Sequence, residues 1–241
     1  MRVGPHSTRI LQGLGYCLAV LTLDSLSTIG LYRGIGVTPW SPASGLALAY
    51  AYLGGPLVWP FVAAAEMLSL WFVNPKRLSA VPLGAAALAT CAIWMASASV
   101  LKSFDTFDPR LRTVTSLLLL FAVAAGSALL HAVVYMFALW GDGLIRYAEM
   151  FPAAWRLVVG DAVGILMVAP LPLLLARDDR SLRPQWVHLA QFLVLLAALW
   201  TVFAFRQATT YQLFYLLFLP LLWVALRDGI RGAVLMLNAA Q

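Results

Sequence analysis

The chain has 241 residues, of which 62% are hydrophobic and 11% are charged. Soluble domains carry roughly 25% charged residues, so this composition excludes an ordinary soluble domain and indicates a protein that spans the lipid bilayer several times. The net charge of +6 comes from Lys and Arg residues that stand in short loops between apolar runs. Because they form no continuous basic stripe, they argue against a nucleic-acid-binding surface.

Apolar runs of about 20 residues predict an all-α, polytopic bundle of transmembrane helices, since a helix of that length crosses the ~30 Å hydrocarbon core. The basic N-terminus leads into the first run without a clear cleavage site, so we expect a retained first helix and one membrane domain over residues 1–241. About eight membrane segments and a truncated last one are expected, at residues 10–31, 44–53, 56–73, 79–101, 113–140, 153–176, 186–205, 211–226 and 233–241.

The second segment, IGVTPWSPASGLALA, is interrupted by Pro39 and Pro42. Proline removes a backbone donor and clashes with the preceding turn, so this segment is predicted to be broken before it becomes helical at Ser44. Ser41 or Ser44 can cap the free N–H groups of the helix start. A broken helix at membrane depth is a common way to build a binding site, and a kinked helix packed on its neighbours is the alternative. A tight turn is expected at residues 54–55.

Asp161 is the first candidate for a functional residue, because an ionised side chain near mid-bilayer costs at least ~3 kcal/mol and needs a partner. Gly160 and Gly164 surround it in a G-x-x-x-G spacing, which allows another helix to approach the backbone closely. The candidate partners are Arg227, His131 and a backbone donor in the 39–44 break.

Arg156 lies five positions before Asp161, about 140° round an ideal helix, so the two side chains do not share a face. We expect Arg156 to reach the membrane interface, with Trp155 beside it as an anchor. Most of the nine tryptophans lie near predicted span ends, which favours an aromatic belt over a cofactor site.

Asp24 and Glu66 form a second acidic set in the middle of their spans. Each is either neutral and hydrogen-bonded, or part of a cation site together with Asp161.

His131 lies in the interior of the predicted span 113–140, and it is either a haem or metal ligand or a polar contact. His6 and His188 stand outside the spans or at an interface, so they supply no second axial ligand at the same depth. We therefore expect no cofactor and no metal ion. Cys17 and Cys91 both lie in apolar segments and are expected to be small packing residues.

The distribution of basic residues predicts the orientation in the membrane. If residues 44–53 cross, one side has ten Lys and Arg and the other has five, which places the N-terminus in the cytoplasm. If this segment is half of a re-entrant hairpin, every later loop changes sides and the bias reverses. The ten-to-five split favours a full crossing.

Three clusters of sequence stand out: PWSPASGLALA at 39–49, GDAVGILMVAP at 160–170 and FLPLLWVALRDGIRGA at 218–233. In this order they resemble the MASE1 family of bacterial integral-membrane sensor domains, whose patterns are W-x-P-x-x-G, G-D-x-x-G-x-x-x-x-x-P and P-x-x-W-x-x-x-R-x-G. The resemblance covers about residues 10–241, and its specificity lies in the ordered set. Asp228 departs from the pattern, since an aromatic residue is expected there.

The resemblance implies a sensory and dimerising input module of the bacterial inner membrane that is not itself an enzyme. Such domains usually precede a cytoplasmic diguanylate cyclase or histidine kinase. No GGDEF-like loop or phospho-acceptor histidine helix occurs before Gln241, so we expect an output domain that is absent from this chain. The expected partners are the lipid bilayer, an unidentified small-molecule ligand, a second copy of the protein and a partner membrane protein.

The leading hypothesis is therefore a sensor in which a ligand or a membrane state alters helix packing. A small ion- or proton-coupled transporter is the alternative, although the sequence shows no repeat. A membrane enzyme with a carboxylate pair ranks last, because no nucleophile–base pair or metal-ligand spacing is present. Arg227 is either a signal-transmitting residue or an interfacial anchor. The candidate ligand-binding residues are Asp161, Trp40, Pro42, Ser44, Gly45, Gly160, Gly164, His131 and Glu66, and the candidate signal-transmission residues are Trp223, Arg227 and Gly229.

Overall fold

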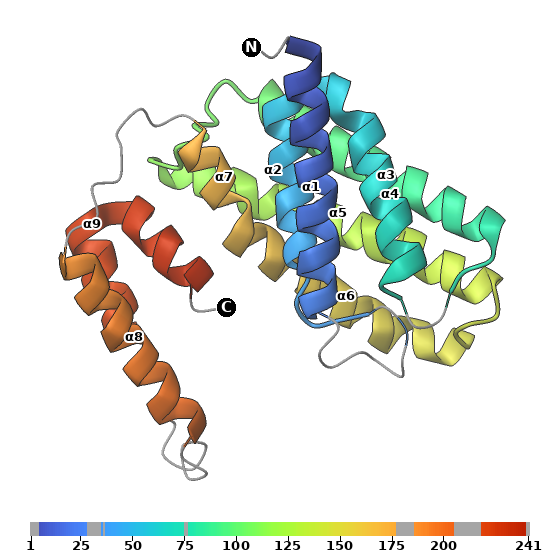
Figure 1. Ribbon diagram of the computed structural model, residues 1–241. Coiled ribbons are helices and arrows are strands. Elements are labelled where there is room, and N and C mark those ends of the chain that lie inside the picture. The colour runs from blue at the N-terminus through green and yellow to red at the C-terminus, as the bar shows by residue number, and fades with distance from the viewer. Residues whose placement is uncertain are drawn as a thin grey trace.

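The computed structural model describes residues 5–27, 35, 37–74, 77–176, 186–204 and 218–239. Within these ranges all regular structure is helical, so the predicted all-α class is confirmed. The helices are α1 (Pro5–Ser27), α2 (Pro42–Gly54), the short 3₁₀ helix η2 (Gly55–Val58), α3 (Trp59–Phe72), α4 (Ala80–Ser103), α5 (Val114–Gly141), α6 (Tyr147–Val168), α7 (Pro170–Leu175), α8 (Trp186–Ala204) and α9 (Phe218–Ala239). Helices α1–α7 pack as one bundle, and α8 and α9 form a pair at its side (Figure 1).

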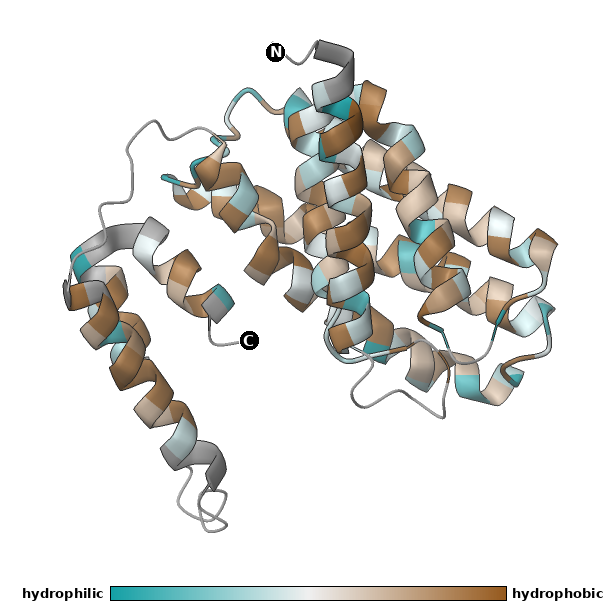
Figure 2. Cartoon of the chain, in the orientation of Figure 1, coloured by the Kyte–Doolittle hydropathy of each residue, from teal (hydrophilic) through white to brown (hydrophobic). Residues whose placement is uncertain are grey.

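Five of the described helical segments are long and apolar enough to cross a membrane. Many large apolar side chains of these helices are exposed, which suits contact with lipid. Hydrophobic residues, drawn in brown, make up much of each helix (Figure 2). Helix α8 has a shorter apolar stretch, Leu189–Trp200, and the predicted run at 211–226 lies partly outside the described residues. The five segments are Thr8–Ser27, Pro42–Phe72, Ala80–Ser103, Val114–Gly141 and Tyr147–Leu175.

The segment Pro42–Phe72 is a helical hairpin. Its first arm, α2, runs antiparallel to α1, since the rings of Tyr16 and Tyr50 stack at 4.1 Å and the start of α2 lies beside the end of α1. Its second arm, α3, runs parallel to α1, because the Cys17 thiol contacts the Phe61 carbonyl and the Ser69 hydroxyl donates to Asp24. The chain therefore reverses at residues 54–58, where Gly55 makes the turn with a φ of 67°.

Each arm of this hairpin is about 20 Å long at 1.5 Å per residue, which is shorter than the ~30 Å hydrocarbon core. A full crossing by residues 44–53 therefore stays a prediction. Helix α2 begins at Pro42 instead of Ser44, with the proline in the first turn, where its missing N–H costs no hydrogen bond. Residues 37–41 before it form no regular structure, as the two prolines predict.

Helices α4, α5 and α6 run up and down beside the hairpin. The start of α4 is tied to the end of α5, where the backbone N–H and hydroxyl of Ser79 both donate to Asp142 over 2.6 Å. The predicted span 153–176 begins earlier, at Tyr147, and is divided into α6 and α7 at Ala169. Pro170 and Pro172 cause this division, since neither can donate a helical hydrogen bond.

The prediction of a loop at residues 227–232 is wrong, because α9 continues through this stretch as one helix, Phe218–Ala239. The stretch contains two glycines and three charged residues but no proline. A glycine costs only about 1 kcal/mol in a helix interior, so charge and glycine alone do not end a helix.

Candidate ligand cavity

A polar cavity of about 80 Å³ lies inside the bundle. One buried water needs roughly 10–15 Å³ of such space, so the cavity has room for several waters or for a ligand of a few heavy atoms. Its walls come from six elements of the bundle, which are far apart in the sequence. The polar side chains in these walls include Asp24, Ser27, Thr38, Ser41, Ser44, Glu66, Ser69, Asn74, Trp94, His131 and Tyr135.

Asp161 lies directly behind the cavity wall and is completely buried. The Ser44 hydroxyl donates to its Oδ1 over 2.6 Å, and His131 Nδ1 lies 2.6 Å from its Oδ2. A carboxylate accepts here, so Nδ1 of His131 carries the proton. Both donors line the cavity, so a group that enters it reaches Asp161 through Ser44 and His131. Of the partners that the sequence left open, the structure pairs Asp161 with His131, and Arg227 lies exposed on α9.

Asp24 and Glu66 each carry one hydrogen bond between helices. The Ser69 hydroxyl on α3 donates to Asp24 on α1, and Trp94 Nε1 on α4 donates to Glu66 over 3.0 Å. Both carboxyl groups also line the cavity. The two acids therefore link three helices around the same space that Asp161 borders.

Gly160 and Gly164 allow the broken segment before α2 to lie directly on α6. A Cβ atom at Gly160 would stand 2.5 Å from the Thr38 carbonyl oxygen, and one at Gly164 would stand 1.8 Å from the Ser41 carbonyl oxygen. Both distances are too short for any side chain. The Ser41 N–H also donates to the Gly160 carbonyl over 3.1 Å. The sequence predicted that a helix would approach this G-x-x-x-G spacing, whereas the structure places the irregular segment at 38–41 and the first turn of α2 against it.

Other predicted residues lie around the cavity and not in its wall. Pro42 and Gly45 are buried in the first turn of α2, where a Cβ at Gly45 would stand 2.3 Å from the Gly164 carbonyl oxygen, and Trp40 is half-buried before it. Trp223, Arg227 and Gly229 lie on α9 outside the wall.

Several wall residues escaped the sequence analysis, among them Thr38, Ser69, Trp94 and Tyr135. A single hydroxyl or indole in an apolar helix carries no distinctive signal. Ser69 could have been found, because it stands three residues after Glu66 and so shares its helix face.

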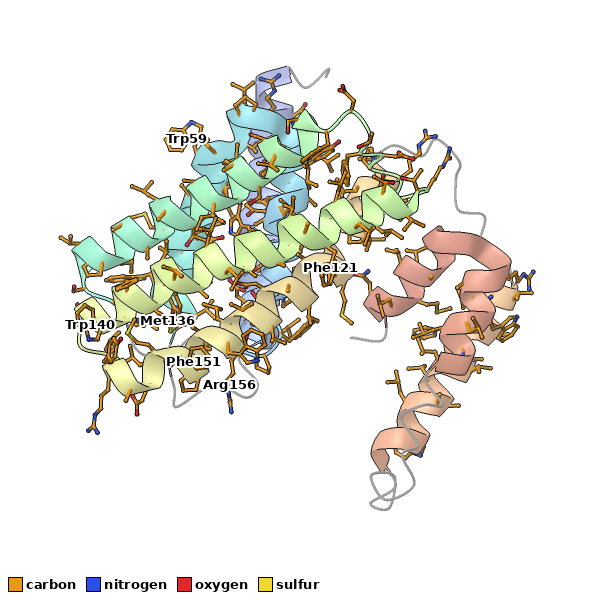
Figure 3. All side chains as sticks on the ribbon, turned by 180° about the vertical axis from the view of Figure 1, so that it is seen from behind. Trp59, Phe121, Met136, Trp140, Phe151 and Arg156 are labelled. Atoms are coloured by element: carbon orange, nitrogen blue, oxygen red, sulfur yellow. The ribbon has the colours of Figure 1, made fainter. Side chains whose placement is uncertain are left out.

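Arg156 points away from the bundle, as predicted, and its side chain is exposed (Figure 3). Trp59 and Trp140 lie exposed near helix ends, in the positions that an aromatic belt requires. Cys17 and Cys91 are free thiols whose sulfur atoms each contact a backbone carbonyl oxygen at 3.5 Å, which is a packing role. Among the described residues, no three or more His, Cys, Asp or Glu side chains gather in a way that could hold a metal ion.

Two of the three motif clusters meet at this cavity, since Ser44 comes from the first and Asp161 from the second. The family model of MASE1 matches residues 9–240, nearly the whole chain. The chain belongs to the MASE1 family. No curated protein and no solved structure matches it. MASE1 is a family of membrane-associated sensor domains that are not themselves catalytic, and the apolar helices of this MASE1 chain make it a multi-pass membrane protein.

Proposed function

We propose that the chain is a membrane-embedded input module that binds a small polar ligand in the cavity. Binding would alter how residues 37–44 pack on α6, and the change would pass to a cytoplasmic diguanylate cyclase or histidine kinase. The hydrogen bond between Ser44 and Asp161 carries this proposal, because it joins two family motifs 117 residues apart at the wall of a polar cavity. The proposal also places the module in a bacterial inner membrane as a homodimer with a cytoplasmic N-terminus.

The charge around the cavity indicates the chemistry of the ligand. Asp24, Glu66 and Asp161 are three acids, and His131 is the one basic side chain among the described residues of the wall. Most of the wall's O–H and N–H donors already bond to these acids or to backbone carbonyls. A ligand that brings N–H donors or positive charge therefore fits better than an anion.

Ligand binding shifts the module only if the ligand prefers one packing over the other. A tenfold difference in affinity supplies about 1.4 kcal/mol of coupling. A ligand N–H group that donates to Asp161 competes with the Ser44 hydroxyl and the His131 ring N–H for the same carboxylate oxygens. This competition makes the affinity for the ligand differ between the two packings.

Thiol labelling tests whether small cations enter the cavity. In a chain with Cys17 and Cys91 replaced by alanine, Ser27→Cys places a thiol in the cavity wall. We expect cationic 2-aminoethyl methanethiosulfonate to react with it at least about tenfold faster than the anionic 2-sulfonatoethyl reagent, because the acids attract the cation. Adding Asp24→Asn should reduce this ratio.

The matched control is Ser127→Cys, a serine on α5 that is equally buried but outside the cavity. Its thiol should resist both reagents. Equal and slow reaction of both thiols would show that the cavity is closed to small cations and would overturn the proposal.

The transporter alternative draws on the same intramembrane acids. Protein reconstituted in liposomes separates the two functions, because a coupled transporter carries protons or ions across the membrane and a sensor does not. Sustained ion-dependent proton flux would favour the transporter.

A further inference from the structure

The side chain of Asn238 joins the last turn of α9 to α6. Its Nδ2 atom donates to the Met167 carbonyl over 2.9 Å and to the Val234 carbonyl of its own helix over 2.8 Å. A carboxamide nitrogen has two hydrogens, so both are used. Asn238 thus holds α9 in one position relative to the end of α6.

Met167 lies at the point where α6 is interrupted. Pro170 and Pro172 have no N–H, so the carbonyls of Leu166 and Val168 lose their usual helical donors. Breaks of this kind are where helices bend. The Met167 carbonyl stands between these two and accepts its bond from another helix.

The same turn also packs on α2. A Cβ atom at Gly45 would stand 2.9 Å from the Val168 Cβ atom, so α2 and the last turn of α6 are in direct contact. Helix α2 carries Ser44, which donates to Asp161. Asp161 itself lies six residues, or ~9 Å along the helix, before Met167. The end of α6 therefore contacts both α2, which carries Ser44, and α9, which carries Asn238.

We propose that Asn238 is the positioning residue through which a change at Asp161 reaches α9. When residues near the cavity repack, the end of α6 moves at its proline break, and the bond from Asn238 to Met167 obliges α9 to move with it. This inference rests on the proposed sensory function and adds a residue outside the predicted set of Trp223, Arg227 and Gly229. Without this bond, α9 would still pack on α6 and α7 but would no longer follow them.

A double-mutant cycle on the whole chain in lipid nanodiscs tests the coupling without any ligand. The four proteins are the unmodified chain, Asp161→Asn, Asn238→Ser and the double variant. Serine can still bond to the Val234 carbonyl but is too short to reach Met167. The readout is hydrogen exchange of the α9 backbone amides, measured by mass spectrometry.

We expect Asn238→Ser to raise exchange in the last two turns of α9 by about threefold to tenfold, the range for one hydrogen bond between membrane helices. Asp161→Asn should raise it in the presence of Asn238 and add nothing in its absence. Asn238→Gln, which keeps the amide donor, should restore part of the dependence. Asp161→Asn without effect on α9, or two effects that simply multiply, would overturn the proposal.

Leu237→Ala is the matched control, since it removes packing from the same turn of α9 and keeps Asn238. Its effect on exchange should multiply with that of Asp161→Asn, because it leaves the coupling intact. The cycle and the thiol-labelling experiment fail independently. A closed cavity overturns the proposed ligand site, whereas independent effects of Asp161 and Asn238 overturn the link to α9.

Discussion

Asp161 keeps a carboxyl group inside an apolar bundle because side chains from two other helices donate to it. Ser44 and His131 satisfy one oxygen each at 2.6 Å, so the cost of burying the group is offset only while both helices stay in place. Asp161 thus holds three helices of the bundle together, and in the proposed function it also responds to the ligand. Removing either donor leaves a buried acceptor unpaired, which costs about 1–3 kcal/mol.

The contact of Gly164 with the broken segment gives a prediction for a single residue. Gly164→Ala should destabilise the protein by about 1–3 kcal/mol, because the new Cβ would stand 1.8 Å from the Ser41 carbonyl oxygen and would push residues 37–41 off α6. Thermal unfolding followed by tryptophan fluorescence measures the change.

Gly126→Ala is the control for this substitution. Gly126 is also inside a helix, and beyond its chain neighbours and the backbone of its own helix no atom lies within 4 Å of a Cβ placed there. The change should be neutral or stabilising by about 0.5–1 kcal/mol, the helix propensity gained from glycine to alanine. Equal losses in both variants would contradict the close approach at Gly164.

Prolines account for much of what the sequence could predict about where the helices begin and end. Pro39 and Pro42 correctly indicated an irregular stretch before α2, and the two glycines at 54–55 indicated the turn of the hairpin. The run at 153–176 was predicted as one span, although Pro170 and Pro172 divide it. The charged stretch at 227–232 was predicted as a loop, because positive charge marks loops in membrane proteins, yet a helix tolerates it.

The hydrogen bonds between Ser79, at the start of α4, and Asp142, at the end of α5, predict that stability depends on pH. The Ser79 hydroxyl and backbone N–H both donate to Asp142, and these bonds lower the pKa of its carboxyl below the ordinary value of 3.8. A carboxyl with a lowered pKa stabilises the fold above its unfolded-state pKa, and this stability is lost as the pH falls through the folded-state value.

Ser79→Ala should therefore lower the unfolding temperature slightly at pH 7, by about 1–3 °C. The difference from the unmodified protein should shrink as the pH falls from 3.8 through the lowered pKa of Asp142, because the carboxylate that accepts the Ser79 hydroxyl is then protonated. Unfolding temperatures measured from pH 7 to pH 3 test this. A difference that stays constant across this range would show that the Ser79 hydroxyl acts without the charge.

The bundle of α1–α7 has two ends, which we expect to face opposite sides of the membrane. The ring of Phe107 lies 5.6 Å from that of Tyr52, so the loop after α4 lies beside the turn of the hairpin and the early part of α1. Ser79 and Asp142 lie together at the other end. Among the described basic residues, Lys102, Arg110 and Arg112 lie at the end that holds the start of α1, and Arg77 and Arg146 lie at the other end.

This arrangement predicts the outcome of labelling in intact bacterial cells with a membrane-impermeant maleimide, again in a chain with Cys17 and Cys91 replaced by alanine. Tyr147→Cys, at an exposed position of the end that we predict to face outward, should be labelled directly. Asp105→Cys, at the end that we predict to be cytoplasmic, should react only after the membrane is permeabilised. The reverse pattern would contradict a cytoplasmic N-terminus.

At this scale the sequence could identify the class, the family and the acids inside the membrane, because each leaves a local pattern. It could not show that Glu66 bonds to Trp94 or that Asn238 reaches Met167. Contacts of this kind depend on the rotation of each helix about its own axis. In these helices both the lipid-facing side and the packed side are apolar, so the sequence gives little indication of that rotation.

The segment at residues 37–41 rests on the backbone of α6, more than a hundred residues later in the chain. During synthesis the early helices enter the bilayer before α6 leaves the ribosome, so this stretch has to wait without its support. The cavity can therefore form only after α6 has inserted beside α1 and α2. A nascent chain that stops before α6 would contain Asp24 and Glu66 without the helix that completes the cavity around them.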